Sequence, residues 1–325
     1  MIDSLTLITT AEVPRDILRT WVPPTTYNHD HDGARHYNVY KYQHGGTYSP
    51  RVTYTVESRK LKVSIPSLPR FYNGTSAVAI DDDTVPMALE QIERYVLGAG
   101  VEQVPEINTW HVASADIYYD FQAGTEIANY MHAFSQIKLA SYITSTYGNE
   151  TVSWISNCRH RDIKFYDRHA KCINQHDDPV TTHFSQGVIR FEVKTRGSDY
   201  RQQVEFTDIG HIYKSNVIIP KLRGFLSNLR LNNLIISNTR DIQRALVQTY
   251  GENRARILYG FLQAQLRGTT INVHRSTIYR YKRDLKALNI APVIGIRRLP
   301  ALEITQIPNT VERLAEVNAY RQQLT

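Results

Sequence analysis

Short stretches in which apolar and polar residues alternate dominate the first two thirds of the chain. A period of two predicts β-strands over Leu5–Ile8, Tyr37–Tyr42, Val52–Val56, Leu61–Ile65, Trp110–Phe121 and Gly187–Lys194. Pro23-Pro24, Gly45-Gly46 and charged turns separate the first strands, which is typical of antiparallel sheet. The pattern therefore predicts a sheet-based N-terminal part.

Helical spacing appears twice in this part and then dominates from Lys221 onward. Val85–Val96 follows an acidic run, and Thr125–Ile143 has apolar residues placed to cover a sheet. In the C-terminal part we expect helices from Thr239 to about Gly251, from Asn253 to Leu266, and from Ser276 or Thr277 to about Leu288.

Residues 151–172 form a predicted hairpin of two buried strands. Val152 and Trp154 share one face of the first strand, and Ile163 and Phe165 repeat the period in the second. The polar turn between them is Asn157-Cys158-Arg159-His160-Arg161.

Tyr166 in the second strand is a candidate nucleophile. It points away from Phe165 and shares a face with Lys164 and Arg168. A phenol with a pKa of about 10 is a poor nucleophile unless nearby cations lower the cost of the phenolate, and such cations are close in the sequence. The simpler interpretation is a half-buried amphipathic tyrosine on a sheet.

Two carboxylates on separate strands are candidate metal ligands. Asp116 lies mid-strand, on the face of Ser114 and Asp120, and Glu192 shares the polar face of its strand with Arg190. Mg²⁺ (or Mn²⁺) favours hard oxygen ligands and open positions for phosphate oxygens. Each acid also fits a structural role, as a hydrogen-bonded Asp near a turn and a salt-bridged Glu. His160 or His169 could complete the shell or move the proton of Tyr166.

The net charge of +7 is unevenly distributed along the 325 residues. Between Lys221 and Arg298 there are 15 Lys or Arg against three acids, and the remainder holds 23 bases and 28 acids. One strongly cationic segment suits a polyanion partner, although a solvated basic face has the same composition.

The last predicted helix carries much of this charge. An apolar stripe of Ile278, Tyr281, Leu285 and Leu288 faces inward, and three short helices with a basic last one resemble a helix-turn-helix DNA-recognition unit. The candidate DNA-binding residues are Arg275, Arg280, Lys282, Arg283 and Lys286.

Targeting signals and a disulfide framework are not evident in the sequence. No run approaches the roughly 18 apolar residues of a membrane span, and the N-terminus lacks a cationic segment leading into an apolar one. We therefore expect a cytoplasmic protein without membrane contact. Cys158 and Cys172 are expected to be reduced structural thiols.

The hairpin resembles the active-site segment of the gene II/X replication initiators of filamentous phages, where a Thr-Val-x-Trp strand leads through an Arg-His-Arg turn to the nicking tyrosine. The similarity extends over nearly the whole chain. Its matching positions are Met1 to Asp3, Ser114 to Asp116, Thr151, Val152, Trp154, Arg159, His160, Arg161, Tyr166, Val188 to Glu192, Ser276 to Arg280 and Leu285 to Ile290. This sequence departs from the family pattern at Ser114, at Asn289 and at Lys171, where the coliphage members have glutamate.

The resemblance implies an α+β protein with an antiparallel-sheet nicking domain flanked by helices over 1–220 and a small basic helical DNA-binding domain with a C-terminal tail over 221–325. It also implies a tyrosine-type DNA endonuclease that nicks and rejoins a phage origin through a 5′-phosphotyrosine, with Arg159, Arg161 and Lys164 stabilising the transition state. Host helicase and polymerase would be partners in the cytoplasm of the infected bacterium, and a homodimer remains open.

The alternative is a non-catalytic origin-binding or repressor protein that uses the same basic segment. Dependence of activity on Mg²⁺ or Mn²⁺ would separate the two, because a pure DNA binder needs neither. A phage structural protein fits the segregated charge poorly.

Overall fold

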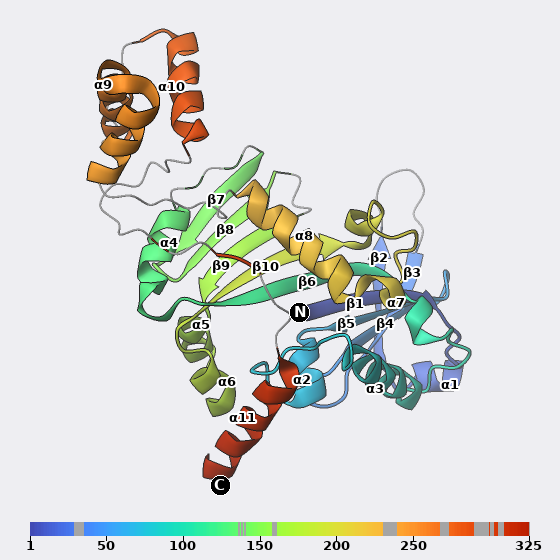
Figure 1. The fold of residues 1–325 in the computed structure, drawn as a ribbon. Coiled ribbons are helices and arrows are strands. Elements are labelled where there is room, and N and C mark those ends of the chain that lie inside the picture. The colour runs from blue at the N-terminus through green and yellow to red at the C-terminus, as the bar shows by residue number, and fades with distance from the viewer. Residues whose placement is uncertain are drawn as a thin grey trace.

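A ten-stranded antiparallel sheet forms the centre of the computed structural model (Figure 1). The structure describes residues 1–28, 36–135, 137, 139, 141–157, 161–229, 239–266, 273–288, 299, 302–304 and 309–324. The strands are β1 (Ile2–Thr10), β2 (Val22–Asn28), β3 (His36–Tyr42), β4 (Arg51–Thr55), β5 (Lys60–Ile65), β6 (His111–Gln122), β7 (Tyr142–Tyr147), β8 (Thr151–Ser156), β9 (Asp162–Asp167) and β10 (Val188–Arg196).

Helices lie between these strands in the sequence and follow the last of them. They are α1 (Arg15–Leu18), α2 (Leu68–Asn73), α3 (Val85–Gly98), α4 (Ile127–Ser135), α5 (Arg168–Asn174), α6 (Pro179–Phe184), α7 (Ile209–Ile212), α8 (Ser215–Asn228), α9 (Thr239–Leu266), α10 (Arg275–Ala287) and α11 (Thr310–Leu324). The expectation of mixed helix and antiparallel sheet is confirmed.

The strand order in the sheet is β2-β3-β4-β5-β1-β6-β10-β9-β8-β7. Two local meanders, β2 to β5 and β7 to β9, are joined by long-range pairings of β1 and β10 with β6. Strand β10 pairs with β6 on one side and with β9 on the other, and both pairings are antiparallel. The predicted hairpin β8–β9 therefore enters the sheet beside residues that are distant in the sequence.

Alternation along the strands gives the sheet one apolar face, which forms the main core. Phe165 stacks on Phe191 with 4.7 Å between ring centroids, and Phe134 of α4 lies 4.3 Å from Phe165. Helix α8 lies across β10 and β6 in Figure 1, and its Leu222 is fully buried in the same core. Helices α4 and α8 thus cover this face and leave the polar residues of the strands on the other.

Two sequence expectations differ from the structure. The helix predicted over Thr125–Ile143 ends at Ser135, because the β-branched residues that follow form strand β7 against β8. Strand β2 was not predicted because Pro23-Pro24 reads as a break. It is an edge strand with a register shift between Val22 and Thr25, where missing N–H donors are tolerated.

The residues predicted as one C-terminal domain from 221 onward are divided among three hydrophobic clusters. The predicted boundary falls inside α8, which belongs to the core of the sheet. Helices α9 and α10 share a separate cluster that includes Leu246, Leu258 and Leu285. Val317 of α11 packs with residues next to α2 and α6. Among the described helices, none combines the length and apolar character needed to cross a membrane.

Candidate active site on the polar face of the sheet

Three neighbouring strands bring polar side chains together on the face opposite the Phe165 core. In β9, β10 and β6, residues in register lie side by side on one face of the sheet. The resulting rows are Tyr166–Arg190–Asp120, Lys164–Glu192–Tyr118 and Asp162–Lys194–Asp116. Sequence reasoning placed Tyr166, Lys164, Asp116 and Glu192 on polar strand faces, and the structure brings these faces together.

Tyr166 and Glu192 contact each other directly in this site. The phenol of Tyr166 donates a hydrogen bond of 2.8 Å to Oε2 of Glu192. The ammonium of Lys164 lies 3.6 Å from Oε1 of Glu192, and that of Lys171, from α5, lies 4.1 Å from the ring centroid of Tyr166. A hydroxyl that donates to a carboxylate oriented by a third group is the arrangement of an activated nucleophile and its base.

Burial changes the acidity of both partners. Tyr166 is 3% exposed and Glu192 is 6% exposed. Burial and the adjacent charge of Glu192 raise the pKa of Tyr166 well above its ordinary value. Burial also opposes ionisation of Glu192, but the charges of Lys171 and Lys164 outweigh it and lower the pKa of that carboxyl. The expectation that nearby cations would favour the Tyr166 phenolate is therefore wrong for this state of the protein, because the cations stabilise the carboxylate instead.

Asp116 lies on the same face, near Glu192. Ser4 donates a 2.7 Å hydrogen bond to Oδ2 of Asp116. Burial and the negative charge of Glu192 raise the pKa of Asp116. A divalent cation would relieve this repulsion between the half-buried carboxyl of Asp116 and the buried carboxylate of Glu192. The described part of the chain holds no group of three or more His, Cys, Asp or Glu side chains that could hold a metal. Mg²⁺ does not require such a cage, since it binds one or two carboxylates together with water and phosphate oxygens. The oxygen donors of Asp116 and Glu192 thus fit Mg²⁺.

A buried network of arginines adjoins Tyr166 and Glu192. Arg190 contacts Asp120 through Nε and Nη2 at 2.7 and 2.9 Å, and Arg168 reaches the same carboxylate at 2.9 Å. Arg190 also lies over the ring of Tyr118, 3.9 Å from its centroid. Because bidentate arginine–carboxylate contacts fix orientation, this network holds the side chains around Tyr166 in place.

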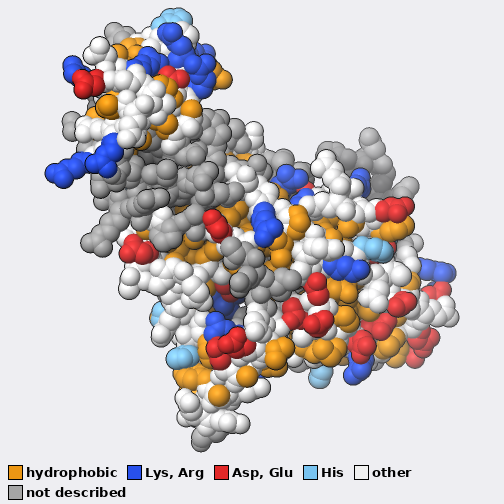
Figure 2. All heavy atoms as spheres, viewed as in Figure 1, with side chains coloured by type: hydrophobic (Ala, Val, Ile, Leu, Met, Phe, Trp, Pro, Cys, Tyr) orange, Lys and Arg blue, Asp and Glu red, His pale blue; other side chains and the backbone are white. Residues whose placement is uncertain are grey.

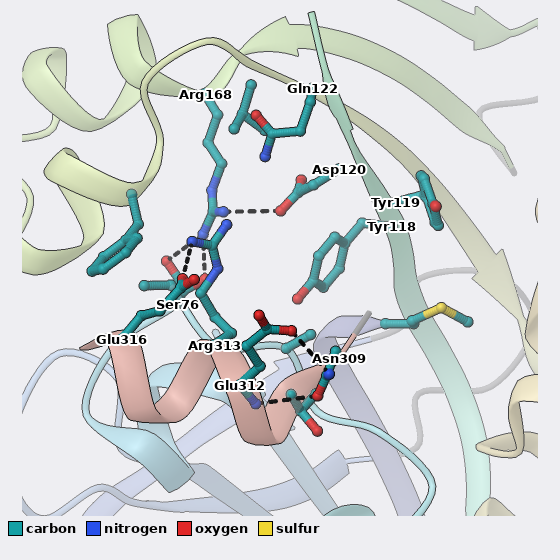
Figure 3. A pocket seen from close by; sticks show the side chains of 16 residues that line it. Ser76, Tyr118, Tyr119, Asp120, Gln122, Arg168, Asn309, Glu312, Arg313 and Glu316 are labelled. Carbon is teal, nitrogen blue, oxygen red and sulfur yellow. Dashed lines mark hydrogen bonds and ion pairs between the residues drawn. The ribbon is translucent and has the colours of Figure 1, made fainter. Parts of the chain in front are cut away.

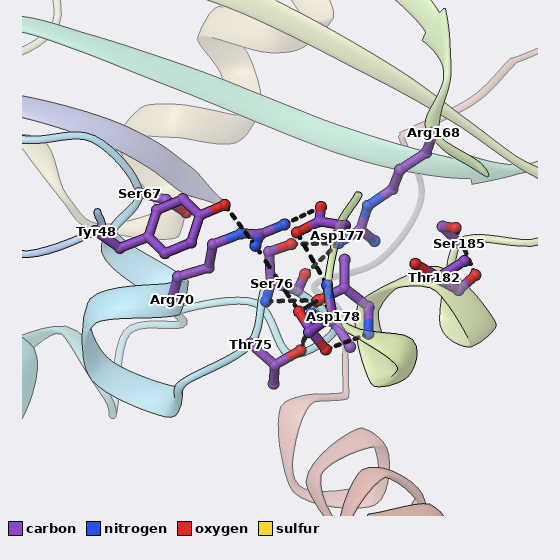
Figure 4. A network of polar contacts seen from close by, with 12 residues as sticks. Tyr48, Ser67, Arg70, Thr75, Ser76, Arg168, Asp177, Asp178, Thr182 and Ser185 are labelled. Carbon is purple, nitrogen blue, oxygen red and sulfur yellow. Dashed lines mark hydrogen bonds and ion pairs between the residues drawn. The ribbon is translucent and has the colours of Figure 1, made fainter. Parts of the chain in front are cut away.

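Two cavities open beside the network. The cavity under α11, about 380 Å³ in volume, is lined by Tyr118, Asp120 and Arg168 from the sheet side and by Glu312, Arg313 and Glu316 from α11 (Figure 3). The Tyr166 cavity, about 220 Å³ in volume, lies between Tyr166 and Arg190 of the sheet, Arg70 of α2, and Arg168 and Lys171 of α5. Figure 4 shows Arg70 contacting Tyr48 and Asp177 at its rim, near Ser76.

Some predicted catalytic residues are not brought into this site. Nδ1 of His169 contacts the carbonyl of Thr182 and Oγ of Ser185 on α6, and no contact with Tyr166 is present among the described residues. Arg161 binds Asp199 and lies over Phe225 of α8, so it belongs to the apolar side of the sheet. Arg161 directly precedes β9, and it lies four residues before Phe165, so the alternation of side chains along β9 continued to Arg161 points it to the face of Phe165. Arg159 and His160 lie outside the described residues.

Sequence reasoning missed Arg190 and Asp120 as partners, and it noted Lys171 only as a departure from a family pattern. The alternation of side chains along the strand placed Arg190 on the polar face, but only the pairing of β10 with β9 brings it beside Tyr166. Lys171 reaches the site because the chain turns into α5 directly after β9. Asp167 caps this helix by accepting bonds from the amides of His169 and Ala170.

Helix α10 presents the predicted basic residues to solvent. Arg275, Arg280, Lys282 and Arg283 are exposed, whereas Leu285 is buried against α9 together with partly buried Ile278, Tyr281 and Leu288. The predicted apolar stripe is confirmed. Figure 2 shows Lys and Arg side chains gathered over the α9 and α10 end of the molecule, far from most of the acidic side chains on the same face. For Lys286, only its place within α10 is described.

Neither the scan against protein-family models nor the search of curated proteins finds a match to this chain.

Proposed function

We propose that this chain is a rolling-circle replication initiator, a DNA endonuclease that nicks one strand at an origin and rejoins it through a 5′-phosphotyrosine at Tyr166. The observation that carries the proposal is the 2.8 Å hydrogen bond from Tyr166 to Glu192, on a polar face where Lys164 and Lys171 lie close to this pair. It supplies a nucleophile and its proton acceptor in one contact. The exposed basic residues of α10 supply a surface for the DNA duplex.

The chemistry follows from this geometry. Oη of Tyr166 attacks the scissile phosphorus while Glu192 accepts the phenolic proton, and the bond from phosphorus to the 3′ oxygen breaks. Glu192 passes the phenolic proton on to the 3′ oxygen, which leaves as a hydroxyl, so that the carboxylate is restored. Attack by that hydroxyl on the phosphotyrosine reverses the step and rejoins the strand.

The surrounding residues stabilise the reacting groups. Burial raises the pKa of Tyr166 and so favours the protonated phenol, and Glu192 would take its proton as the phenol attacks. Lys164 and Lys171 would stabilise the added negative charge at phosphorus. Asp116 and Glu192 would hold Mg²⁺ or Mn²⁺, which would neutralise charge on the scissile phosphate.

The setting in the cell is part of the same proposal. The origin would belong to a filamentous phage in the cytoplasm of the infected bacterium. The freed 3′-hydroxyl would prime a host polymerase, and a host helicase would open the duplex.

One observation favours a second candidate, a DNA-binding protein without a nucleophile. Tyr166 is 3% exposed, which limits its access to a phosphodiester. In this alternative the same hydrogen bond stabilises the sheet, and the basic face of α10 alone carries the function.

The deciding experiment uses supercoiled DNA that contains the replicon of this protein, with Mg²⁺ and with a chelator. Wild type is expected to nick the DNA and to become covalently attached to a 5′ end, and Tyr166→Phe is expected to do neither. Tyr118→Phe is the matched control, because Tyr118 is equally buried at 3% and lies opposite Glu192 on the same face, whereas the hydrogen bond to the Glu192 carboxylate comes from Tyr166. Binding without an adduct in all three proteins would favour the second candidate, and an adduct in Tyr166→Phe would refute the assignment of the nucleophile.

A further inference from the structure

The side chains that line the Tyr166 cavity include more cations than carboxylates. Its lining includes Arg70, Arg168, Lys171 and Arg190, against the carboxylates of Asp3 and Asp177. Buried positive charge in a region of low dielectric attracts an anion more strongly than the same charge does in water.

Lys171 is the cation with the fewest partners in this lining. Arg70 pairs with Asp177, and Arg168 and Arg190 both pair with Asp120. No carboxylate lies within 4 Å of the Lys171 ammonium among the described residues, and its nearest described contact is the ring of Tyr166. An ammonium held over the ring of the nucleophile has three donors available for oxygen acceptors.

Arg190 offers a second donor. Its Nε and Nη2 are occupied by Asp120, whereas its Nη1 lies 3.8 Å from Oδ2 of Asp3, which is beyond hydrogen-bonding distance. Asp3 itself accepts a 2.9 Å bond from Ser67, which also lines the cavity. An oxyanion in the cavity would therefore have the guanidinium of Arg190 and the ammonium of Lys171 as possible donors.

The volume of the cavity limits what it can hold. At about 220 Å³ it is smaller than the roughly 300–1,000 Å³ of sites that take drug-sized ligands. It has room for several waters, each of which occupies about 30 Å³, or for one small tetrahedral anion. A nucleobase with its sugar would not fit inside.

The larger cavity under α11 does not share this chemistry. Its charged lining combines Arg168 and Arg313 with the acids Asp120, Glu312 and Glu316 (Figure 3). Cations and acids nearly balance in that lining, whereas cations outnumber acids in the lining of the Tyr166 cavity.

We propose that the Tyr166 cavity binds a backbone phosphate of a single DNA strand, held by Lys171 and Arg190 beside Tyr166. The binding chemistry stands on the cavity and its cations, and only the source of the phosphate rests on the proposed function. A phosphate bound there would hold the strand next to the nucleophile pair and so supply the positioning that phosphoryl transfer needs.

The test measures binding of inorganic phosphate and of an unphosphorylated oligothymidylate to the full-length chain by calorimetry, without cleavage. Lys171→Gln is expected to weaken both by about tenfold or more, since a charge-assisted bond contributes at least that factor. Lys171→Arg should retain most of the affinity. Lys62→Gln, which changes an exposed lysine of β5, is the matched control and should bind as wild type does.

Three results would overturn the inference. They are no binding of millimolar phosphate by wild type, equal affinities of wild type and Lys171→Gln, or a requirement for a terminal phosphate on the oligonucleotide. If Lys171→Gln does not fold, the rate at which an amine-reactive reagent labels wild type is measured in place of the binding of the variant. The inference then requires that phosphate slows labelling of Lys171 but not of Lys62. Phosphate binding by Tyr166→Phe together with absence of nicking by wild type would refute the proposed function and leave the cavity assignment intact.

Discussion

Tyr166 and Glu192 are diagonal neighbours on adjacent strands, and the phenol of one donates a 2.8 Å hydrogen bond to the carboxylate of the other. In the register Tyr166 lies opposite Arg190, and Glu192 lies opposite Lys164. The two acid–base groups are therefore interleaved with two cations in a square of four side chains. The two cations favour the ionised form of Glu192 while its carboxylate accepts the hydrogen bond of the protonated phenol, and in the proposed function this is the state before nucleophilic attack.

Replacement of Glu192 by Gln should abolish nicking without weakening DNA binding. The variant keeps the size of the side chain but removes the proton acceptor, so formation of the covalent adduct should slow by about 10²–10⁴-fold at neutral pH. Single-turnover adduct formation on origin DNA measures this effect. Glu205→Gln, at an exposed position, is the control. An adduct rate for Glu192→Gln within twofold of wild type would remove Glu192 from the mechanism.

Asp120→Asn should destabilise the protein, because it leaves Arg190 and Arg168 without their shared carboxylate. Removing one partner of a buried ion pair lowers the free energy of unfolding by about 3–5 kcal/mol. We expect a loss near the lower end of this range, because the Asp120 side chain is 24% exposed. Urea unfolding at pH 7 measures the change. Glu57→Gln, on the surface between β4 and β5, should differ little from wild type. Loss of less than about 1 kcal/mol would show that the arginines find other partners.

The same carboxylate makes stability depend on pH. Burial opposes ionisation of Asp120, but the charges of Arg190 and Arg168 prevail and lower its pKa to about 2 from an ordinary 3.8. A carboxyl whose pKa is lower in the folded than in the unfolded protein stabilises the fold at pH values above its unfolded-state pKa. This stabilisation is lost as the pH falls through the pKa of the folded state. About 2 kcal/mol should therefore disappear between pH 4 and pH 2 in wild type but not in Asp120→Asn. Parallel pH profiles for the two proteins would contradict this assignment.

The spacing of apolar and polar residues along the chain predicted much of this fold, but the site depends on contacts between residues that are distant in the sequence. Period-two alternation located most strands and the correct face of Tyr166, and helical spacing predicted the Leu285 stripe of α10. The partners of Tyr166 depend on β10 lying between β6 and β9, a pairing that no local signal encodes. Lys171 reaches the site because the chain turns from β9 into α5, where side chains no longer alternate between the two faces of the sheet. Arg161 lies on the other face of the sheet, whereas its nearness to Tyr166 in the sequence suggested a shared site.

The basic face of α10 should bind DNA through phosphates. Replacing Arg280 by Ala should weaken binding about equally for all sequences and reduce the slope of log affinity against log salt by about 0.9 if it contacts one phosphate. Fluorescence anisotropy with a labelled duplex at several salt concentrations measures both. Lys60→Ala, an exposed cation on β5, is the control. A salt slope unchanged in Arg280→Ala would place the DNA contact elsewhere.

Leu285→Ala should loosen α9 and α10 while leaving the sheet intact, because Leu285 belongs to a hydrophobic cluster separate from the sheet core. Deleting a buried leucine side chain costs about 2–5 kcal/mol. Amide hydrogen exchange should therefore accelerate in α9 and α10 and stay slow in β6, β9 and β10. The matched control is Leu222→Ala, a fully buried leucine of α8 whose loss should accelerate exchange in the sheet. Faster exchange in the sheet strands of Leu285→Ala, equal to that in α10, would show that the two clusters unfold as one unit. Exchange confined to α9 and α10 would mean that the helix pair can change its contacts with DNA without disturbing Tyr166 and Glu192.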